Sequence, residues 1–312
     1  MSVRPLTSLA FKPHPIGRFL VDLPEESVIG QWYQTYGASG RISVVPEVSV
    51  EEFEAAVMRR TEGLRSIPHE EGGTQLEKTL TFDFPHGHGV LYWENNYLKG
   101  DLLKADCYAW HGGFLYKCEA ETWCEPEQQR SDLRWLSQIL ASIRPLQPDE
   151  IPTEYGFCFK DSILVDQPIA EGLETIIATA HWRDRPDVLF HFSTLPNNQT
   201  TDPPLLTRVH RPSLLAGIRV LRSGQRNLAS GEPGEEHLER IKEGNGAVGH
   251  LFIWEAQGLP KFQYEHPQIR LEMTTGNGPQ GPEHASLSDA DALKVWDAVV
   301  GSIRLRPVTR PG

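Results

Sequence analysis

The sequence predicts an α+β protein of two related domains, each a mainly antiparallel sheet packed with helices. Strand-like segments follow one another in runs and helical segments stand at the ends of each half, an order that favours α+β over doubly wound α/β. Two of the helical segments close with the same three residues, Ser-Ile-Arg. The stretch "PLQPDEIPTEYG" between them is rich in proline and acidic residues, which is typical of a linker.

The two closing helices share their apolar pattern as well as their ending. When "LRWLSQILASIRP" is aligned with "LKVWDAVVGSIRL" on Ser-Ile-Arg, apolar residues recur at i, i+3, i+6, i+7 and i+10 in both. This spacing marks one stripe of an amphipathic helix. We therefore predict an internal duplication, with domains at 16–148 and 153–307. In each copy the isoleucine should be buried, and Arg144 or Arg304 should lie near the last helix carbonyls, where a cation is favoured.

The other elements follow from local pattern. "SVEEFEAAVMRRTEGL" predicts a helix, because Ser49 and Glu52 form a capping box, and Ser288 is a good N-cap for the last helix. Strands are predicted for "LEKTLTFDF", "GVLYWENNYL", "LLKADCYAW" and "FLYKCEAETW" in the first half, as an antiparallel meander. In the second half they are predicted for "ETIIATAHW", "DVLFHFSTL", "GHLFIWEAQG" and "IRLEMTTG", and helices for "RPSLLAGIRVLRSG" and "GEEHLERIKEG".

Two of the four cysteines face each other in the predicted hairpin. Gly112-Gly113 permits the positive φ values of a two-residue turn, and Cys107 and Cys118 then stand opposite each other as a hydrogen-bonded pair. The Cα separation of such a pair is about 5.5 Å, which a disulfide can span. A disulfide and two small buried thiols both remain open, and the rarity of cytosolic disulfides favours the thiols.

Composition excludes several classes of protein. The chain has 312 residues, an ordinary globular composition and a net charge of −12, so the basic surplus that nucleic-acid binding needs is lacking. The sequence contains no run of about 20 apolar residues, so no membrane-spanning helix is predicted. The first residues lack the apolar core of a signal peptide. We expect either a cytoplasmic protein or one whose export signal is removed or missing from this sequence.

No catalytic, metal or cofactor motif is present. GxSxG, HExxH, Walker and GxGxxG patterns do not occur. His86 and His88 could bind a metal only with a third ligand, and a turn with solvated histidines is favoured. Glu235 and Glu236 are interpreted as acidic residues at a helix start. Glu255 is expected to face solvent. We therefore predict no cofactor, no metal and no catalytic residues.

Aromatic and arginine side chains are the remaining candidates for binding. Such residues concentrate the binding energy of protein interfaces. Those that stand beside charges in predicted turns are Trp32, Tyr33, Trp182, Arg183 and Arg185. We predict that they contact a partner protein.

An ordered series of segments resembles a known family. The segments are "GRFLVDLPE", "VSVEEFEAAVMRR", "PDEIPTEYGFCF", "LRSGQRNLASGEPGEE", "FIWEAQG", "IRLEMTTG" and "LSDADALKVWDAVVGSIRLRP". Together they cover about Ile16 to Pro307 and resemble the immunity proteins paired with antibacterial type VI secretion lipase effectors. The resemblance implies a non-enzymatic protein with two lobes that form a pincer. It would bind a phospholipase effector one to one, and block the movement of its lid or the entrance to its active site.

The resemblance also implies that the protein is located in the periplasm, takes no small-molecule substrate and is a monomer when free. Two other functions are kept as alternatives. A hydrolase with a site between the domains would use His86, His88, Glu235 or Glu255, and those residues would then share one pocket. An adaptor of a secretion apparatus would assemble into oligomers.

Overall fold

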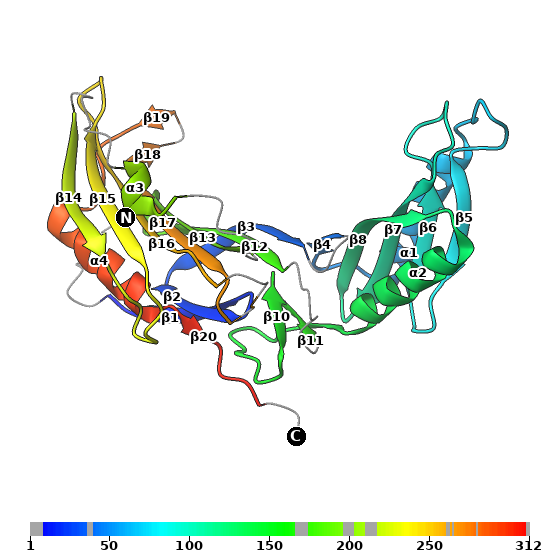
Figure 1. Cartoon of the computed structure of the whole chain (residues 1–312), viewed down its shortest axis with the longest axis horizontal. Helices are drawn as coiled ribbons and strands as arrows, with labels where there is room; N and C mark the ends of the chain where they lie inside the picture. Colours follow the sequence, from blue (N-terminus) through cyan, green and yellow to red (C-terminus); the bar gives the residue numbers. More distant parts are fainter. Residues whose placement is uncertain are drawn as a thin grey trace. The chain divides into compact units, whose positions relative to one another are not determined.

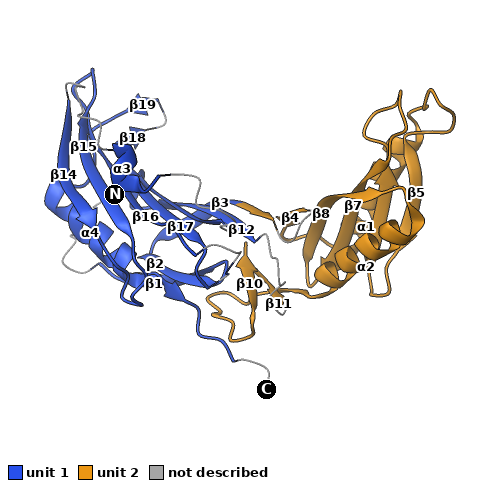
Figure 2. Cartoon of the chain, viewed as in Figure 1, with its two compact units in different colours: residues 1–32, 170–309 blue, residues 33–169, 310–312 orange. Residues whose placement is uncertain are grey.

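The computed structural model describes residues 9–35, 40–165, 174–195, 203–209, 217–259, 263, 265–278 and 280–309. The chain forms two compact units (Figure 2). Unit 1 holds residues 1–32 and 170–309, and unit 2 holds residues 33–169 and 310–312. Antiparallel strands dominate both units and a few helices pack on them (Figure 1). The predicted α+β class, with mainly antiparallel sheets and a few helices packed on them, is confirmed.

Unit 2 is a five-stranded sheet with a long helix on each face. The sheet order is β4-β8-β7-β6-β5, all antiparallel. The strands are β4 (Arg41–Val45), β5 (Leu76–Thr81), β6 (Gly87–Tyr92), β7 (Leu102–His111) and β8 (Phe114–Trp123). Helix α1 (Val50–Arg65) bonds to Asp106 and α2 (Pro126–Ala141) bonds to Thr122. Thr122 pairs with Leu103, which is three residues from Asp106 along β7. Side chains an odd number of residues apart on a strand point to opposite faces, so α1 and α2 contact opposite faces of the sheet.

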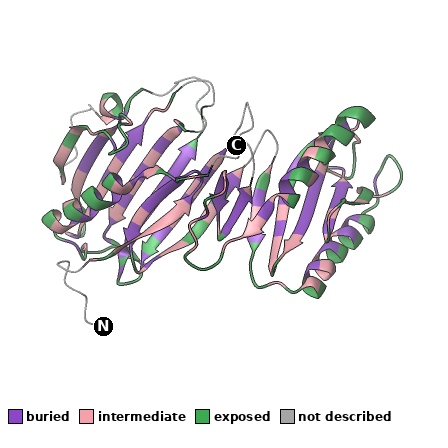
Figure 3. Cartoon of the chain, turned by 90° about the horizontal axis from the view of Figure 1, so that it is seen from below, coloured by how far each residue is buried: buried purple, intermediate pink, exposed green. Residues whose placement is uncertain are grey.

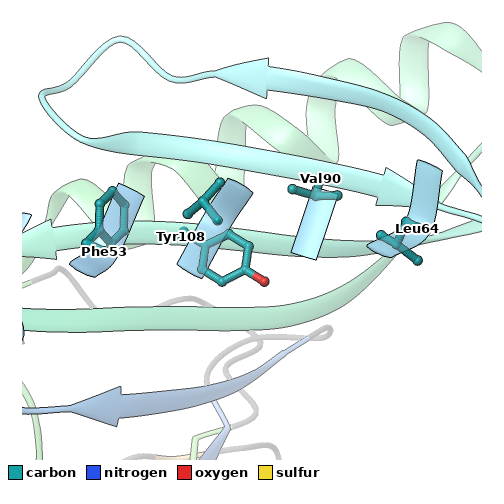
Figure 4. Close-up of a cluster of buried hydrophobic side chains, with 5 residues drawn as sticks. Phe53, Leu64, Val90 and Tyr108 are labelled. Atoms are coloured by element: carbon teal, nitrogen blue, oxygen red, sulfur yellow. The ribbon is translucent and has the colours of Figure 1, made fainter. Parts of the chain in front are cut away.

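Helix α1 begins as predicted. The Ser49 side chain accepts from the Glu52 backbone N–H, and the Glu52 carboxylate accepts from the Ser49 backbone N–H. This capping box satisfies two N–H groups that a helix start leaves without partners. Figure 4 shows side chains of the apolar cluster that joins the helix to the sheet. The cluster consists of Phe53, Val57 and Leu64 from α1 with Val90 and Tyr108 from β6 and β7.

Unit 1 contains a larger antiparallel sheet in the order β14-β15-β16-β17-β13-β12-β3. The strands are β14 (Ile218–Gln225), β15 (Glu235–Lys242), β16 (Val248–Ala256), β17 (Gln268–Thr275), β13 (Arg185–Leu195), β12 (Thr175–Trp182) and β3 (Ser27–Thr35). Helix α4 (Asp289–Ser302), capped by Ser288 as predicted, packs Trp296 on Phe252 of β16. The small helix α3 is Leu205–Val209, and β18 (Asn277–Gly278) pairs with β19 (Gly281–Pro282). Figure 3 shows buried positions concentrated in the strands and exposed positions on the outer sides of the helices.

Two predicted helices of the second half are wrong. Residues 218–225 form β14 and residues 235–242 form β15, and the two strands pair along their length. Residues 211–216 of the first predicted helix lie outside the described part of the chain. Glu236 and Leu238 of β15 are buried, and pairing with β14 and β16 outweighs the helix propensity of this charged segment.

The two units share one strand order over five strands. The order β4-β8-β7-β6-β5 in unit 2 matches β13-β17-β16-β15-β14 in unit 1, strand for strand in chain order. In each unit a helix then leads into a short strand, β9 (Ile143–Pro145) after α2 and β20 (Arg304–Leu305) after α4. This shared order supports the predicted duplication.

The unit boundaries differ from the predicted 16–148 and 153–307 because each half gives its first hairpin to the other. The hairpin of β1 (Phe11–Ile16) and β2 (Phe19–Pro24) pairs with β20, in the order β1-β2-β20. The hairpin of β10 (Gly156–Phe159) and β11 (Ser162–Val165) pairs with β9, in the order β10-β11-β9. Each compact unit therefore includes the hairpin that it receives from the other half. The bounds 16–148 and 153–307 describe the repeated halves of the sequence, and they stay a prediction.

The two Ser-Ile-Arg endings perform the predicted structural role in part. Ile143 and Ile303 are both buried. The guanidinium of Arg304 donates to the Ser302 carbonyl at 2.6 Å, beside the helix end. Arg144 instead binds Glu150 and Glu154 of the linker and the carbonyl of Pro145. Among the described residues, no helix is long and apolar enough to cross a membrane.

Candidate partner-binding surfaces

Two of the five predicted contact residues belong to the interior of unit 1. Trp182 is only 3% exposed and Arg185 only 8%. The Arg185 guanidinium lies 5.4 Å from the centre of the Trp182 ring, and Nη1 donates to the Ser286 carbonyl at 2.8 Å. This arrangement joins the β12–β13 hairpin to the segment before α4. The predicted role of these two side chains as partner contacts is corrected to a structural one, because neither has surface to offer.

The other three predicted residues keep exposed surface. Trp32 and Tyr33 lie in β3 rather than in a turn. Trp32 is half-buried, Tyr33 is exposed, and the Arg41 guanidinium lies 5.5 Å from the Tyr33 ring centre. Arg183 is exposed in the β12–β13 turn, and its backbone N–H donates to the Glu26 carbonyl at 3.1 Å. Their contact with a partner stays a prediction.

His86 and His88 converge on one carboxylate in unit 2. His86 Nδ1 lies 3.4 Å from Glu54 Oε1, and His88 Nε2 lies 3.3 Å from Glu54 Oε2. Both rings also pack against Phe53 of α1. Within the described residues, no group of three or more His, Cys, Asp and Glu side chains has the geometry to hold a metal ion. The pair therefore helps to dock α1 on the sheet.

The carboxylates singled out in the second half lie in strands of unit 1. Glu235 and Glu236 are in β15, so their predicted place at a helix start is wrong. Glu255 is only 3% exposed, which corrects the expectation that it faces solvent. Arg208 of α3 and Arg270 of β17 both bind this carboxylate. A buried charge that is paired on two sides is satisfied structurally.

These positions are not all in one unit. His86 and His88 belong to unit 2, whereas Glu235 and Glu255 belong to unit 1. The residues proposed for a hydrolase site are thus divided between the two units.

A Ser-His-Glu array is present on unit 1, but it is built along one sheet face. Ser223 Oγ lies 3.0 Å from His237 Nδ1, and His237 Nε2 lies 2.9 Å from Glu239 Oε1. Ser223 is the register partner of His237, and Glu239 is two residues further along β15. Side chains at these positions meet through the alternation of strands alone. We interpret the array as a cross-strand contact in which both ring nitrogens of the buried His237 have hydrogen-bond partners.

Unit 1 has a sheet face that the described residues leave only partly covered. We call Thr179, His191, Ile253, Arg270 and Glu272 the polar face of unit 1. All five are half-buried, and they alternate with buried residues on the α4 side. The described helix on this side is the five-residue α3, whereas in unit 2 each face of the sheet carries a helix of 16 residues. Sequence reasoning missed this surface, because no local pattern separates it from a covered strand face.

Charges on the polar face are arranged in pairs. Burial lowers the pKa of His191, opposed by the nearby charge of Glu272. Its Nδ1 lies 3.1 Å from the Thr179 hydroxyl. Burial also acts to lower the pKa of Arg270, but hydrogen bonding to Glu272 and the charge of Glu255 outweigh burial and raise that pKa. An uncharged imidazole, paired charges and an apolar Ile253 form a mixed surface like those of protein interfaces.

Unit 2 holds one buried charged cluster. Asp106 is buried under α1, where Arg60 Nε donates to it at 2.8 Å and Lys117 Nζ lies 3.2 Å away. The Tyr92 and Tyr108 hydroxyls donate to the same carboxylate at 3.4 Å. Burial, assisted by the charge of Asp106, raises the pKa of both tyrosines. The cluster fixes α1 on the sheet around a buried carboxylate.

The two facing cysteines are paired in register as predicted. Cys107 lies opposite Cys118, and His111 opposite Phe114 around Gly112-Gly113, whose φ angles are both positive. Both thiols are buried and free in the structure. Burial raises the pKa of both, to about 12 for Cys118.

Three solved structures share this fold over nearly the whole chain. The apo immunity protein TplEi of the type VI secretion system of Pseudomonas aeruginosa has a TM-score of 0.83 at 25% identity, covering 98% of this chain and 100% of that one. A Tle4–Tli4 complex has a TM-score of 0.82 at 25% identity with the same coverage. TplEi bound to an "L" peptide has a TM-score of 0.75 at 25% identity, covering 96% and 99%.

The sequence itself matches a family. No curated protein sequence matches this chain. Residues 150–308, which are half of the chain, match the C-terminal domain of Tle cognate immunity protein 4. The structural relatives described as TplEi and Tli4 are immunity proteins rather than enzymes. Because this family model matches half of the chain, the chain belongs to the Tle cognate immunity protein 4 family.

Proposed function

We propose that this protein binds and neutralises a cognate type VI secretion lipase effector. The observation that carries the proposal is the match of nearly the whole chain to the Tle4–Tli4 complex structure. The family match to a Tle cognate immunity protein agrees with it. The described polar clusters around Asp106 and Glu255 are ion-paired within their own units and stabilise the fold, which agrees with a protein that acts by binding.

Inhibition would be stoichiometric and would depend on surface area and preorganised contacts. One immunity protein, a monomer when free, would bind one effector and block its lid movement or its active-site entrance. A tight complex of this kind needs a large buried surface and little reordering on binding. The two-lobed grip that the family resemblance implies is part of this proposal.

We assign the polar face of unit 1 to the effector, and we keep Trp32, Tyr33 and Arg183 as separate predicted contacts. A test on this face needs a substitution that adds bulk and charge without removing a buried ion pair. Ile253→Arg meets this condition, because Ile253 is half-buried and carries no polar contact. Leu305→Arg is the matched control, since Leu305 is exposed on β20, in the separate three-stranded sheet of the same unit. We expect Ile253→Arg to weaken effector binding at least tenfold and Leu305→Arg to leave it unchanged.

We also propose a periplasmic location, on the ground of the family resemblance. Fractionation of cells that express the full natural gene would test it. Recovery of the protein only with cytoplasmic markers would contradict the location and leave the binding function standing.

The experiment that tests the manner of inhibition uses two substrates. The cognate lipase effector would be assayed on phospholipid vesicles and on a water-soluble short-chain ester, each with increasing immunity protein. Loss of both activities indicates a blocked entrance, because even a small ester is then excluded. Loss of vesicle hydrolysis alone indicates a lid held closed. Full activity on both substrates in excess immunity protein would contradict the proposed function.

A further inference from the structure

The loop between β6 and β7 exposes two large apolar side chains that the fold does not use. Tyr97 is 61% exposed and Leu98 is 57% exposed. They are adjacent in sequence, and the β6–β7 loop that carries them lies at one end of unit 2 (Figure 1). Single exposed apolar residues are ordinary, whereas two adjacent ones at the end of a unit make that end a candidate interaction site. We call residues Asn95–Lys99 the β6–β7 tip.

The tip is held in place before any partner arrives. The Asn95 side chain accepts from the backbone N–H groups of Tyr97 and Leu98 at 3.0 and 2.9 Å, which is an Asx-type turn. Lys99 Nζ donates to the Gly72 carbonyl at 2.9 Å, and the Glu70 N–H donates to the Asn96 carbonyl at 2.9 Å.

These contacts tie the tip to the loop between α1 and β5. A preordered apolar pair loses little conformational entropy on binding, and tyrosine is among the residues that contribute most to interfaces. The tip therefore has the properties of an anchor for a partner rather than those of a tolerated surface loop.

The rim of the tip is acidic. The two neighbouring loops, 69–73 and 94–101, carry four exposed carboxylates and one ammonium, Lys99. The carboxylates are Glu70, Glu71, Glu94 and Asp101. Anionic phospholipid surfaces repel such a rim, whereas a protein surface with basic side chains attracts it. The charge pattern favours a protein partner over a membrane.

We propose that the β6–β7 tip inserts into an apolar patch rimmed by basic side chains on the lipase effector. This inference rests on the proposed function and names a contact within it. A lipase must present apolar surface where acyl chains enter, so such a patch is expected near its substrate entrance. Tyr97 and Leu98 provide the apolar contact, and the acidic rim sets the orientation and the rate of association.

The first test replaces both apolar side chains. The full chain carrying Tyr97→Ser and Leu98→Ser would be titrated into purified effector by calorimetry, with Met58→Ser as control. Met58 is 64% exposed on α1 of the same unit. We expect the double variant to bind at least tenfold more weakly with an unchanged melting temperature, and the control to bind as the parent does.

The outcomes separate this inference from the function on which it rests. A parent protein that does not bind the effector overturns both. A parent that binds, together with a double variant that binds equally well, overturns the tip alone. Vesicles of phosphatidylethanolamine and phosphatidylglycerol provide the third arm. Binding to them that Tyr97→Ser and Leu98→Ser abolish, with effector affinity retained, would assign the tip to a membrane instead.

The second test addresses the acidic rim. Glu70→Gln, Glu94→Gln and Asp101→Asn together neutralise three of its four carboxylates and leave the Glu71 contact with the Lys99 N–H intact. We expect a severalfold slower association rate at low salt and a smaller dependence of that rate on ionic strength. An unchanged rate at low salt would contradict the basic rim assigned to the effector.

Discussion

Leu20 and Arg304 are register partners in one antiparallel ladder, although they stand near opposite ends of the chain. Ile163 and Arg144 form the equivalent pair in unit 2. The equivalence extends to the next backbone hydrogen bond in each unit. The Arg306 N–H donates to the Arg18 carbonyl, and the Leu146 N–H donates to the Asp161 carbonyl, both at 2.8 Å. Each half of the sequence therefore completes the unit built mainly by the other half.

The exchange predicts where a core deletion acts. Leu20→Ala removes a buried side chain from the hairpin of unit 1, and Ile163→Ala does the same in unit 2. Each should cost about 2–5 kcal/mol of unfolding free energy. Hydrogen exchange should accelerate in α4 and β20 for Leu20→Ala, and in α2 and β9 for Ile163→Ala. Faster exchange in β7 and β8 for Leu20→Ala, with α4 unchanged, would show that the hairpin belongs to its own half.

This exchange also shows what sequence could predict. The capping box of Ser49 and Glu52, the strand Phe114–Trp123 and the facing cysteines depend on neighbours in sequence, and the structure contains all of them. The partner of β2 lies far along the chain, so no local pattern indicates it. The segment "EEHLERIK" has helical composition, and only its pairing with β14 and β16 makes it a strand.

The buried carboxylate of Glu255 predicts an asymmetric response to substitution. Arg208 and Arg270 are each about one third exposed, so water can solvate them if Glu255→Gln removes the charge, at a cost of about 1 kcal/mol. Replacing both arginines by methionine strands a buried charge and should cost about 3–5 kcal/mol. Adding Glu255→Gln to that double variant should restore most of the loss in urea unfolding. A double variant no less stable than Glu255→Gln alone would contradict this account.

The cysteines predict a simple pattern of thiol labelling. Cys107, Cys118 and Cys158 are buried and Cys124 is partly exposed. Raised pKa values keep Cys107 and Cys118 protonated near neutral pH, and the protonated thiol is the unreactive form. A thiol reagent should label at most Cys124 in the native protein and all four residues after unfolding without reductant. Two reactive thiols after unfolding would indicate a disulfide between Cys107 and Cys118.

His111 predicts a loss of stability in weak acid. Burial lowers its pKa from the ordinary value of 6.5, and Nε2 donates to the Leu140 carbonyl at 2.9 Å. The unfolded chain then takes up the proton first, so this stabilisation is complete above about pH 6.5 and is lost as the pH falls from 6.5 towards the folded pKa. Urea unfolding of His111→Gln should show a smaller loss between pH 7.5 and 5.5 than the parent. An equal loss would assign the effect to other groups, with His191 the first to be tested.

Residues that contact a partner were harder to predict from the sequence than helices and strands were. Trp182 and Arg185 have the composition of an interface, yet they pack on each other in the interior. Tyr97 and Leu98 lie within a segment that reads as a strand, and only the Asx turn at Asn95 turns them outward. Exposure is a property of the tertiary fold, so side-chain type alone did not separate the two cases.

The central claim is that this protein neutralises a lipase by occupying it and performs no chemistry itself. The most direct test is a titration of the cognate effector with this protein, with phospholipid hydrolysis followed at each ratio. The account predicts a linear fall in activity that reaches zero at one immunity protein per effector, and no hydrolysis by the immunity protein alone. Undiminished hydrolysis at a severalfold excess of immunity protein would contradict it.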